Sequence, residues 1–174
     1  GLKVAHRALE RGTYPGGVWW VHAEGKPIDA LVNLGSTLRD HGPAPVRAIA
    51  VYIWVTVALN TATWLARIIP AVVHGGLPRY LRGTGLTVNV VYVQDLALWL
   101  PLLAVAATWL WRRRPWGYLL AGAGLVMWVL ESTSIAVDQW YGHAAAPASP
   151  VASGALVPAF AALAVIGVIP AGLL

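Results

Sequence analysis

Four long apolar stretches constrain the fold of this 174-residue chain more than any other feature of its sequence. They occupy residues 48–73, 88–111, 116–137 and 151–174. Each stretch is long enough to cross a hydrocarbon core of about 30 Å as a helix that rises about 1.5 Å per residue. Because the apolar residues are consecutive and do not alternate with polar ones, the pattern favours helices over the strands of a membrane barrel.

The composition supports a membrane environment. Hydrophobic residues make up 58% of the chain and charged residues 11%, whereas soluble proteins carry about 25% charged residues. So few charges cannot cover the surface of a soluble protein, which excludes a cytosolic enzyme, a disordered tail and a secreted disulfide-rich domain. The chain has no cysteine, so thiolate metal sites and thiol nucleophiles are excluded as well.

The charges divide the chain into two parts. Ten of the charged residues fall within the first 47 positions, and a Gly-Pro-Ala-Pro linker lies near the end of this part, at residues 42–45. We therefore expect a polar N-terminal segment over 1–45 and a transmembrane domain over 46–174. Residues 2–10 have a helical pattern, 17–21 resemble a short buried strand and 27–38 predict a second helix. The predicted fold is an all-α membrane protein, an antiparallel bundle of four transmembrane helices with a short α-β-α appendage.

An arginine-rich turn predicts the orientation of the bundle. Arg112, Arg113 and Arg114 separate the second and third apolar stretches, with Trp111 and Trp116 as an aromatic belt on either side. Arginines mark cytoplasmic loops, and tryptophans gather at the membrane interface. The opposite loop, residues 74–87, also carries two arginines, so the charge bias is partial. We expect a multi-pass protein of the inner (plasma) membrane, with both termini cytoplasmic.

Three charged side chains inside the apolar stretches supply the candidate site. Arg67, Asp95 and Glu131 come from three different predicted helices. A charge at the centre of a bilayer costs about 2.5–3.5 kcal/mol, so such residues are functional candidates. Counting the helical rise from the ends of the stretches places all three about 10 Å below the non-cytoplasmic surface. We expect them to meet in one layer, where one arginine is able to form a bidentate pair with one carboxylate and to bond to the second.

Polar and aromatic neighbours extend this layer at helical spacing. These candidate ligand or proton-site residues are Asn60, Trp64, Tyr92, Gln94, Trp99 and Trp128. Together they predict a cavity, open to the non-cytoplasmic side, for a polar or cationic small molecule or for protons. The alternatives are a purely structural ion-pair layer that fixes helix register, and catalysis by one of the carboxylates.

Other chemistry receives little support from the sequence. None of the five histidines lies in the middle of an apolar stretch, and no two share a helical i, i+3 or i+4 spacing on one. No G-x-S-x-G motif occurs. We therefore expect no metal site, no catalytic nucleophile and no cofactor. Gly117, Ala121 and Gly124 form a small-residue stripe that allows another helix to approach closely.

Two segments resemble known families. The run Gly-Gly-Val-Trp-Trp-Val-x-Ala-Glu at 16–24 resembles part of the signal-transduction NTPases related to the NB-ARC class. The phosphate-binding motif G-x-x-x-x-G-K-[ST] of such NTPases is absent here, because Gly25-Lys26 is followed by Pro27, so no nucleotide is expected. The runs 83–96 and 112–118 resemble a family of uncharacterised bacterial polytopic membrane proteins over about 46–143. That resemblance implies four helices and supplies no activity, ligand or catalytic residue.

The leading functional hypothesis is a non-enzymatic membrane component that binds a small ligand or associates with a complex. The alternatives are an intramembrane enzyme that uses a carboxylate as acid or base, and a structural accessory subunit. The expected partners are the lipid bilayer and either a second copy or another membrane protein. Nucleic acid is not expected, because the net charge of +5 is explained by basic residues that flank membrane spans.

Overall fold

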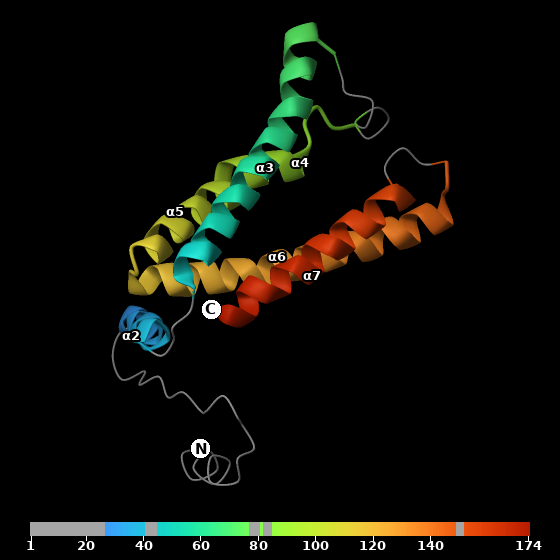
Figure 1. Cartoon of the computed structure of the whole chain (residues 1–174). Coiled ribbons are helices and arrows are strands. Elements are labelled where there is room, and N and C mark those ends of the chain that lie inside the picture. The colour runs from blue at the N-terminus through green and yellow to red at the C-terminus, as the bar shows by residue number, and fades with distance from the viewer. Residues whose placement is uncertain (1–26, 41–44, 77–80, 82–84, 149–151) are drawn as a thin grey trace.

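The computed structural model describes residues 27–40, 45–76, 81, 85–148 and 152–174. All regular secondary structure within these ranges is helical (Figure 1). The helices are α2 (Pro27–Asp40), α3 (Val46–His74), α4 (Val90–Gln94), η2 (Asp95–Trp99), α5 (Leu100–Trp111), α6 (Pro115–Ala145), η3 (Gly154–Leu156) and α7 (Val157–Leu173). The helix predicted at 2–10 and the strand predicted at 17–21 lie outside the described residues.

Four helical stretches are long and apolar enough to span a membrane, which confirms the predicted number. They are Val46–His74, Val90–Trp111, Pro115–Ala145 and Gly154–Leu173. The third continues past residue 137, where the apolar stretch ends, because its next residues are polar and aromatic and still compatible with a helix. Hydropathy marks the apolar part of a helix and not its end.

The turn between α5 and α6 is closed by backbone hydrogen bonds. Arg113 adopts a left-handed conformation with φ of 52°. Its N–H donates to the carbonyl of Leu110 at 2.8 Å, and the N–H of Arg114 donates to the carbonyl of Trp109 at 2.9 Å. This pattern satisfies the last carbonyls of α5, and Pro115 then begins α6 without needing an N–H partner. The arginine turn is therefore a compact helix stop as well as a charged loop.

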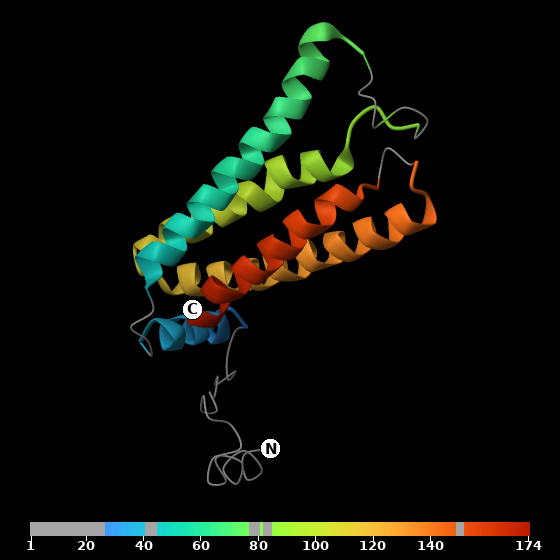
Figure 2. The ribbon, with the colours of Figure 1, turned by 45° about the vertical axis from the view of Figure 1, so that its right-hand side comes forward.

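The packed core occupies the half of the bundle next to this turn. Every buried residue of α3 lies between Val46 and Val57, and those of α5 lie between Leu100 and Leu110. Away from the turn, the pair formed by α3 and the second span diverges from the pair formed by α6 and α7 (Figures 1 and 2). The bundle is closed at one end and splayed at the other.

Small residues set the spacing at the closed end. Gly117 is buried on α6, and a Cβ added there would collide with the backbone of Leu110 and Trp109. Ala121 is completely buried one turn further along, and Gly124 faces the side chain of Leu103. The small-residue stripe therefore brings α6 against the backbone of α5, as close approach of membrane helices requires.

The pair of α6 and α7 is joined near the opposite end of the bundle. Gln139 is buried, and its Oε1 accepts a hydrogen bond from the backbone N–H of Ser153 at 2.8 Å. Further along α7, Gly167 lies against the side chain of Val129 on α6. These contacts hold α7 to α6 along most of its length, so the splaying separates the two pairs and leaves each pair intact.

We predict that Gly117→Ala destabilises the bundle, because the added methyl group meets backbone that cannot rotate away. The expected loss is about 1–3 kcal/mol, as for overpacked cores. The measurement is reversible unfolding of the full chain in detergent micelles. Gly122→Ala is the matched control on the same helix, since its Cβ would lie 3.7 Å from the Leu174 side chain, an ordinary contact. Equal stability of the two variants would contradict the packing described here.

Candidate functional site

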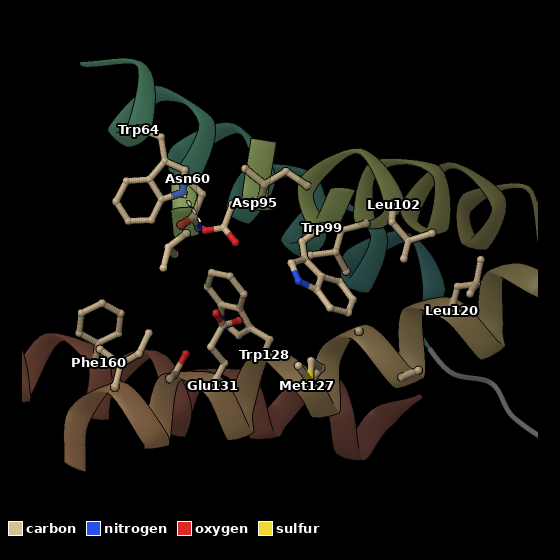
Figure 3. Close-up of a pocket in the computed structure, with 17 residues that line it drawn as sticks. Asn60, Trp64, Asp95, Trp99, Leu102, Leu120, Met127, Trp128, Glu131 and Phe160 are labelled. Atoms are coloured by element: carbon tan, nitrogen blue, oxygen red, sulfur yellow. Dashed lines mark hydrogen bonds between the residues drawn. The ribbon is translucent and has the colours of Figure 1, made fainter. Parts of the chain in front are cut away.

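A cavity of about 330 Å³ lies between the two helix pairs, where the packed core ends (Figure 3). Its acidic and polar lining residues are Asp95, Glu131, Asn60 and Ser132. Its aromatic lining residues are Trp64, Trp99, Trp128 and Phe160. The rest of the lining is aliphatic except for Met127 and Gly124. The cavity is therefore an apolar chamber that contains two carboxyl groups.

A π-helical turn positions the second span in this wall. The N–H of Leu100 donates to the carbonyl of Asp95, five residues back, so the helix widens over Asp95–Trp99. Pro101 follows directly and has no N–H to donate to Ala97, which removes one α-helical bond at this point. Both ends of the widened turn, Asp95 and Trp99, line the cavity. Such π-bulges occur frequently at functional sites.

Asp95 is held in place from the neighbouring helix. The indole Nε1 of Trp64 on α3 donates to Asp95 Oδ2 at 2.9 Å, and the acceptor is partly buried. The Trp64 ring stacks on Tyr92 with centroids 4.2 Å apart and an interplanar angle of 24°. Tyr92 is itself buried, with 6% of its surface exposed. One hydrogen bond and one stacked ring pair thus fix the position of the carboxylate.

Arg67 does not join the carboxylates, contrary to the prediction. Its Nη1 donates to the hydroxyl of Tyr92 at 3.3 Å. No ion pair within the described residues connects it to Asp95 or Glu131, and it does not line the cavity. Arg67 does reach the second span, but through Tyr92 and not through Asp95. The helical rise could not predict the direction of the side chain, which depends on the rotation of α3 about its own axis.

Six of the predicted site residues line one cavity: Asn60, Trp64, Asp95, Trp99, Trp128 and Glu131. The other three do not. Tyr92 is buried behind Trp64, Arg67 bonds to Tyr92, and Gln94 is exposed on the surface of α4. Asn60 directs its Nδ2 to the carbonyl of Thr56 at 3.0 Å. Its side-chain donor is therefore already engaged within α3.

Sequence reasoning missed the apolar wall of the cavity. Met127 lies on α6, one turn before Glu131, and Phe160 lies on α7. Phe160 is the only phenylalanine of the chain, which is the one signal that marks it within a span made almost entirely of aliphatic residues. The other apolar lining residues carry no sequence signal, because apolar residues occupy most positions of these helices.

The charged groups that line the cavity are all acidic among the described residues. The carboxyl groups of Asp95 and Glu131 point into the space between the helices from opposite walls (Figure 3). No lysine, arginine or histidine is among the described residues that line it. No described side chain donates a hydrogen bond to Glu131. Among the described residues, no three of His, Cys, Asp and Glu come close enough together to hold a metal ion.

Comparison with known proteins adds no assignment: no protein-family model matches the sequence, and neither a curated protein nor a solved structure gives a match.

We predict that Trp64→Phe destabilises the bundle by about 0.5–2 kcal/mol, the range for a single hydrogen bond between membrane helices. Phenylalanine keeps a ring to stack on Tyr92 and removes only the donor to Asp95. Trp54→Phe on the same helix is the control, because Trp54 is 45% exposed and makes no hydrogen bond with a described residue.

A double-mutant cycle with Asp95→Ala isolates this hydrogen bond. The coupling energy between positions 64 and 95 is measured by unfolding in micelles. A coupling indistinguishable from zero would show that the hydrogen bond contributes nothing to stability.

Proposed function

We propose that this protein is a membrane-spanning, non-enzymatic protein that binds a small organic cation with an apolar body. The observation that supports it is the cavity itself. Two carboxylates and three tryptophans line one chamber that no described basic residue enters. Arg67, which the sequence placed in this layer, is engaged by Tyr92 and leaves both carboxylates available.

A cationic group is the ligand chemistry that the lining favours. An uncompensated carboxylate within a bilayer is costly, and an ammonium between Asp95 and Glu131 would supply the missing charge. Tryptophan faces attract cations, with energies of about 0.5–2 kcal/mol. The three cavity tryptophans, Trp64, Trp99 and Trp128, come from α3, η2 and α6. Trp64 directs its N–H edge to Asp95 and stacks on Tyr92, so Trp99 and Trp128 are the rings whose faces would meet a cation.

The apolar part of the ligand would extend toward the packed core. Leu102, Leu103 and Leu120 line the cavity on that side, together with Met127. Ligand sites in proteins are commonly apolar with a few polar groups that fix orientation. The polar groups here gather around Asp95 and Glu131, and the leucines lie nearer the arginine turn. This arrangement favours a ligand with one charged end and one apolar end.

The proposal includes the orientation of the four spans in the membrane. We infer that the four spans cross the inner membrane in alternate directions, as an antiparallel bundle, with the Arg112–Arg114 turn and both termini on the cytoplasmic side. The splayed half of the bundle would then face the opposite surface. A ligand would enter from that surface or from the outer part of the bilayer. Homo-oligomers and membrane-protein partners remain compatible with this reading.

The test compares a cation with its neutral isostere. Phenyltrimethylammonium and tert-butylbenzene have the same shape and differ in charge. We predict that the cation raises the unfolding temperature of the full chain in micelles and that the isostere does so less. Asp95→Asn and Glu131→Gln should each lower the affinity for the cation about tenfold or more, the loss expected when a charged partner of the ligand is removed.

Asp138→Asn is the matched control, because Asp138 is exposed, lies on α6 two turns beyond Glu131 and does not line the cavity. Equal binding of cation and isostere, or equal binding by all three variants, would overturn the proposal.

A second candidate function follows from the same observation. Since Arg67 neutralises neither carboxylate, one of them is free to act as an acid or base on a bound substrate. Mass spectrometry of lipid-soluble amines incubated with the protein separates the two functions. Recovery of unchanged amine supports binding alone. A product that forms only when both Asp95 and Glu131 are present supports an enzyme.

A further inference from the structure

Helix α2 lies across the closed end of the bundle, next to the turn between α5 and α6 (Figures 1 and 2). It contacts the start of α6 through Gly35, the only buried residue of the helix. A Cβ at Gly35 would collide with the carbonyl of Pro115, so the two backbones touch. Leu38, one turn later, packs against the core of the bundle. The second half of α2 is thus fixed to the ends of the spans.

The face that makes these contacts continues beyond the bundle. Ile28, Leu31, Gly35 and Leu38 follow one another at intervals of three or four residues and share one stripe of the helix. Yet Ile28 is 49% exposed and Leu31 is 45% exposed. Since Gly35 and Leu38 face the ends of the spans, Ile28 and Leu31 face the same way, and their exposure shows that the spans do not cover them. If the four apolar helices cross a membrane, uncovered apolar side chains at the ends of the spans would meet the bilayer.

The opposite face of α2 is polar. It carries Asp29, Asn33, Ser36, Thr37 and Asp40. Asn33 is exposed, and its carbonyl accepts a hydrogen bond from the Thr37 hydroxyl at 2.8 Å. Helices that lie in the plane of a membrane interface have one apolar stripe and one polar face. The two faces of α2 therefore have the arrangement that this position requires.

Basic side chains crowd the same end of the molecule. Arg112, Arg113 and Arg114 are exposed in the turn beside α2, and Arg47 is exposed at the start of α3, 5.6 Å from the Trp111 ring. Arg39, on α2 itself, pairs with Asp40 at 2.9 Å. Basic residues at a membrane surface attract anionic headgroups. The charge of this end is complementary to a bilayer that contains acidic phospholipids.

We propose that α2 is an interfacial helix that docks on the bilayer beside the bundle. Ile28 and Leu31 insert among the acyl chains, and the arginines of the turn bind the phosphates of anionic lipids. The docking of α2 anchors this helix to the membrane surface. The docking does not involve the cavity, so the proposal does not depend on the proposed ligand.

The absence of cysteine from the chain makes the test direct, because a single introduced cysteine carries a spin label without competition. The full chain is reconstituted into phosphatidylcholine vesicles with added phosphatidylglycerol. Labels at Ile28→Cys and Leu31→Cys are compared with labels at Asp29→Cys and Asn33→Cys, on the polar face. We expect the first pair to collide more with oxygen, which partitions into lipid, and the second pair more with a water-soluble nickel chelate.

Three outcomes would overturn the proposal. Labels at 28 and 31 that collide with the nickel chelate as often as those at 29 and 33 would show that α2 is surrounded by water. Spectral broadening that disappears on dilution with unlabelled protein would show that a second copy covers the stripe. Labels at 28 and 31 that are shielded from both reagents without broadening would show that α2 is covered by protein.

A separate experiment tests whether anionic lipid contributes to the docking of α2. Omission of phosphatidylglycerol should reduce the depth of positions 28 and 31, and Arg112→Gln with Arg114→Gln should abolish that lipid dependence. A depth that is unchanged by lipid composition would overturn the role of the arginines. Binding of phenyltrimethylammonium, measured on the same reconstituted variants, should be unaffected.

Discussion

The contact between α6 and α5 at Gly117 sets the geometry of the whole bundle. With no Cβ at this position, the two backbones approach closely directly after the arginine turn. The apolar side chains of α3 pack over this joint and bury Ile49, Ala50 and Ile53. No comparable contact joins the two helix pairs at their other ends within the described residues. Close approach at one end therefore leaves the other end free to splay.

The splayed half of the bundle leaves room for a site between the two helix pairs, and the lining of this room determines what can occupy it. Beyond Val57 no residue of α3 is buried, and the space between the pairs is lined by the cavity residues. An apolar lining alone would be filled by lipid. The two carboxylates make lipid chains poor occupants, because hydrocarbon cannot compensate their charge. The widened turn at Asp95–Trp99 and the hydrogen bond from Trp64 hold one carboxylate toward this space.

Sequence reasoning predicted the elements of this structure that depend on periodicity and length. The four spans follow from apolar runs, and the gathering of Asp95 and Glu131 in one cavity follows from equal depth on different helices. The pairing of Arg67 was wrong, because depth along a helix does not specify which way a side chain faces. The π-turn at Asp95 was not anticipated either, although Pro101 was its available signal.

Other features required the packing itself. Phe160 belongs to a helix that is apolar on every side, and Met127 belongs to one that has apolar residues on every side of its few polar ones, so hydropathy does not distinguish a cavity face from a lipid face. The helix predicted at 27–38 is present as α2, but its docking through Gly35 against Pro115 could not be read from either residue alone. Such contacts join positions far apart in sequence, and local sequence patterns do not predict them.

If the cavity binds cations between its two carboxylates, cations should reach it more readily than anions. The most direct measurement is the modification of a single cysteine at Ile135→Cys, which lines the cavity one turn beyond Glu131. Two methanethiosulfonate reagents of similar size, one cationic and one anionic, are applied to the full chain in vesicles, with Leu130→Cys, a position that is 62% exposed on α6 and outside the cavity, as the lipid-facing control.

We predict that position 135 reacts about tenfold or more faster with the cationic reagent, as expected where acidic walls concentrate cations, and that position 130 reacts with neither reagent. Equal rates with the two reagents at position 135, or no reaction with either, would contradict a cation-binding cavity between the helix pairs.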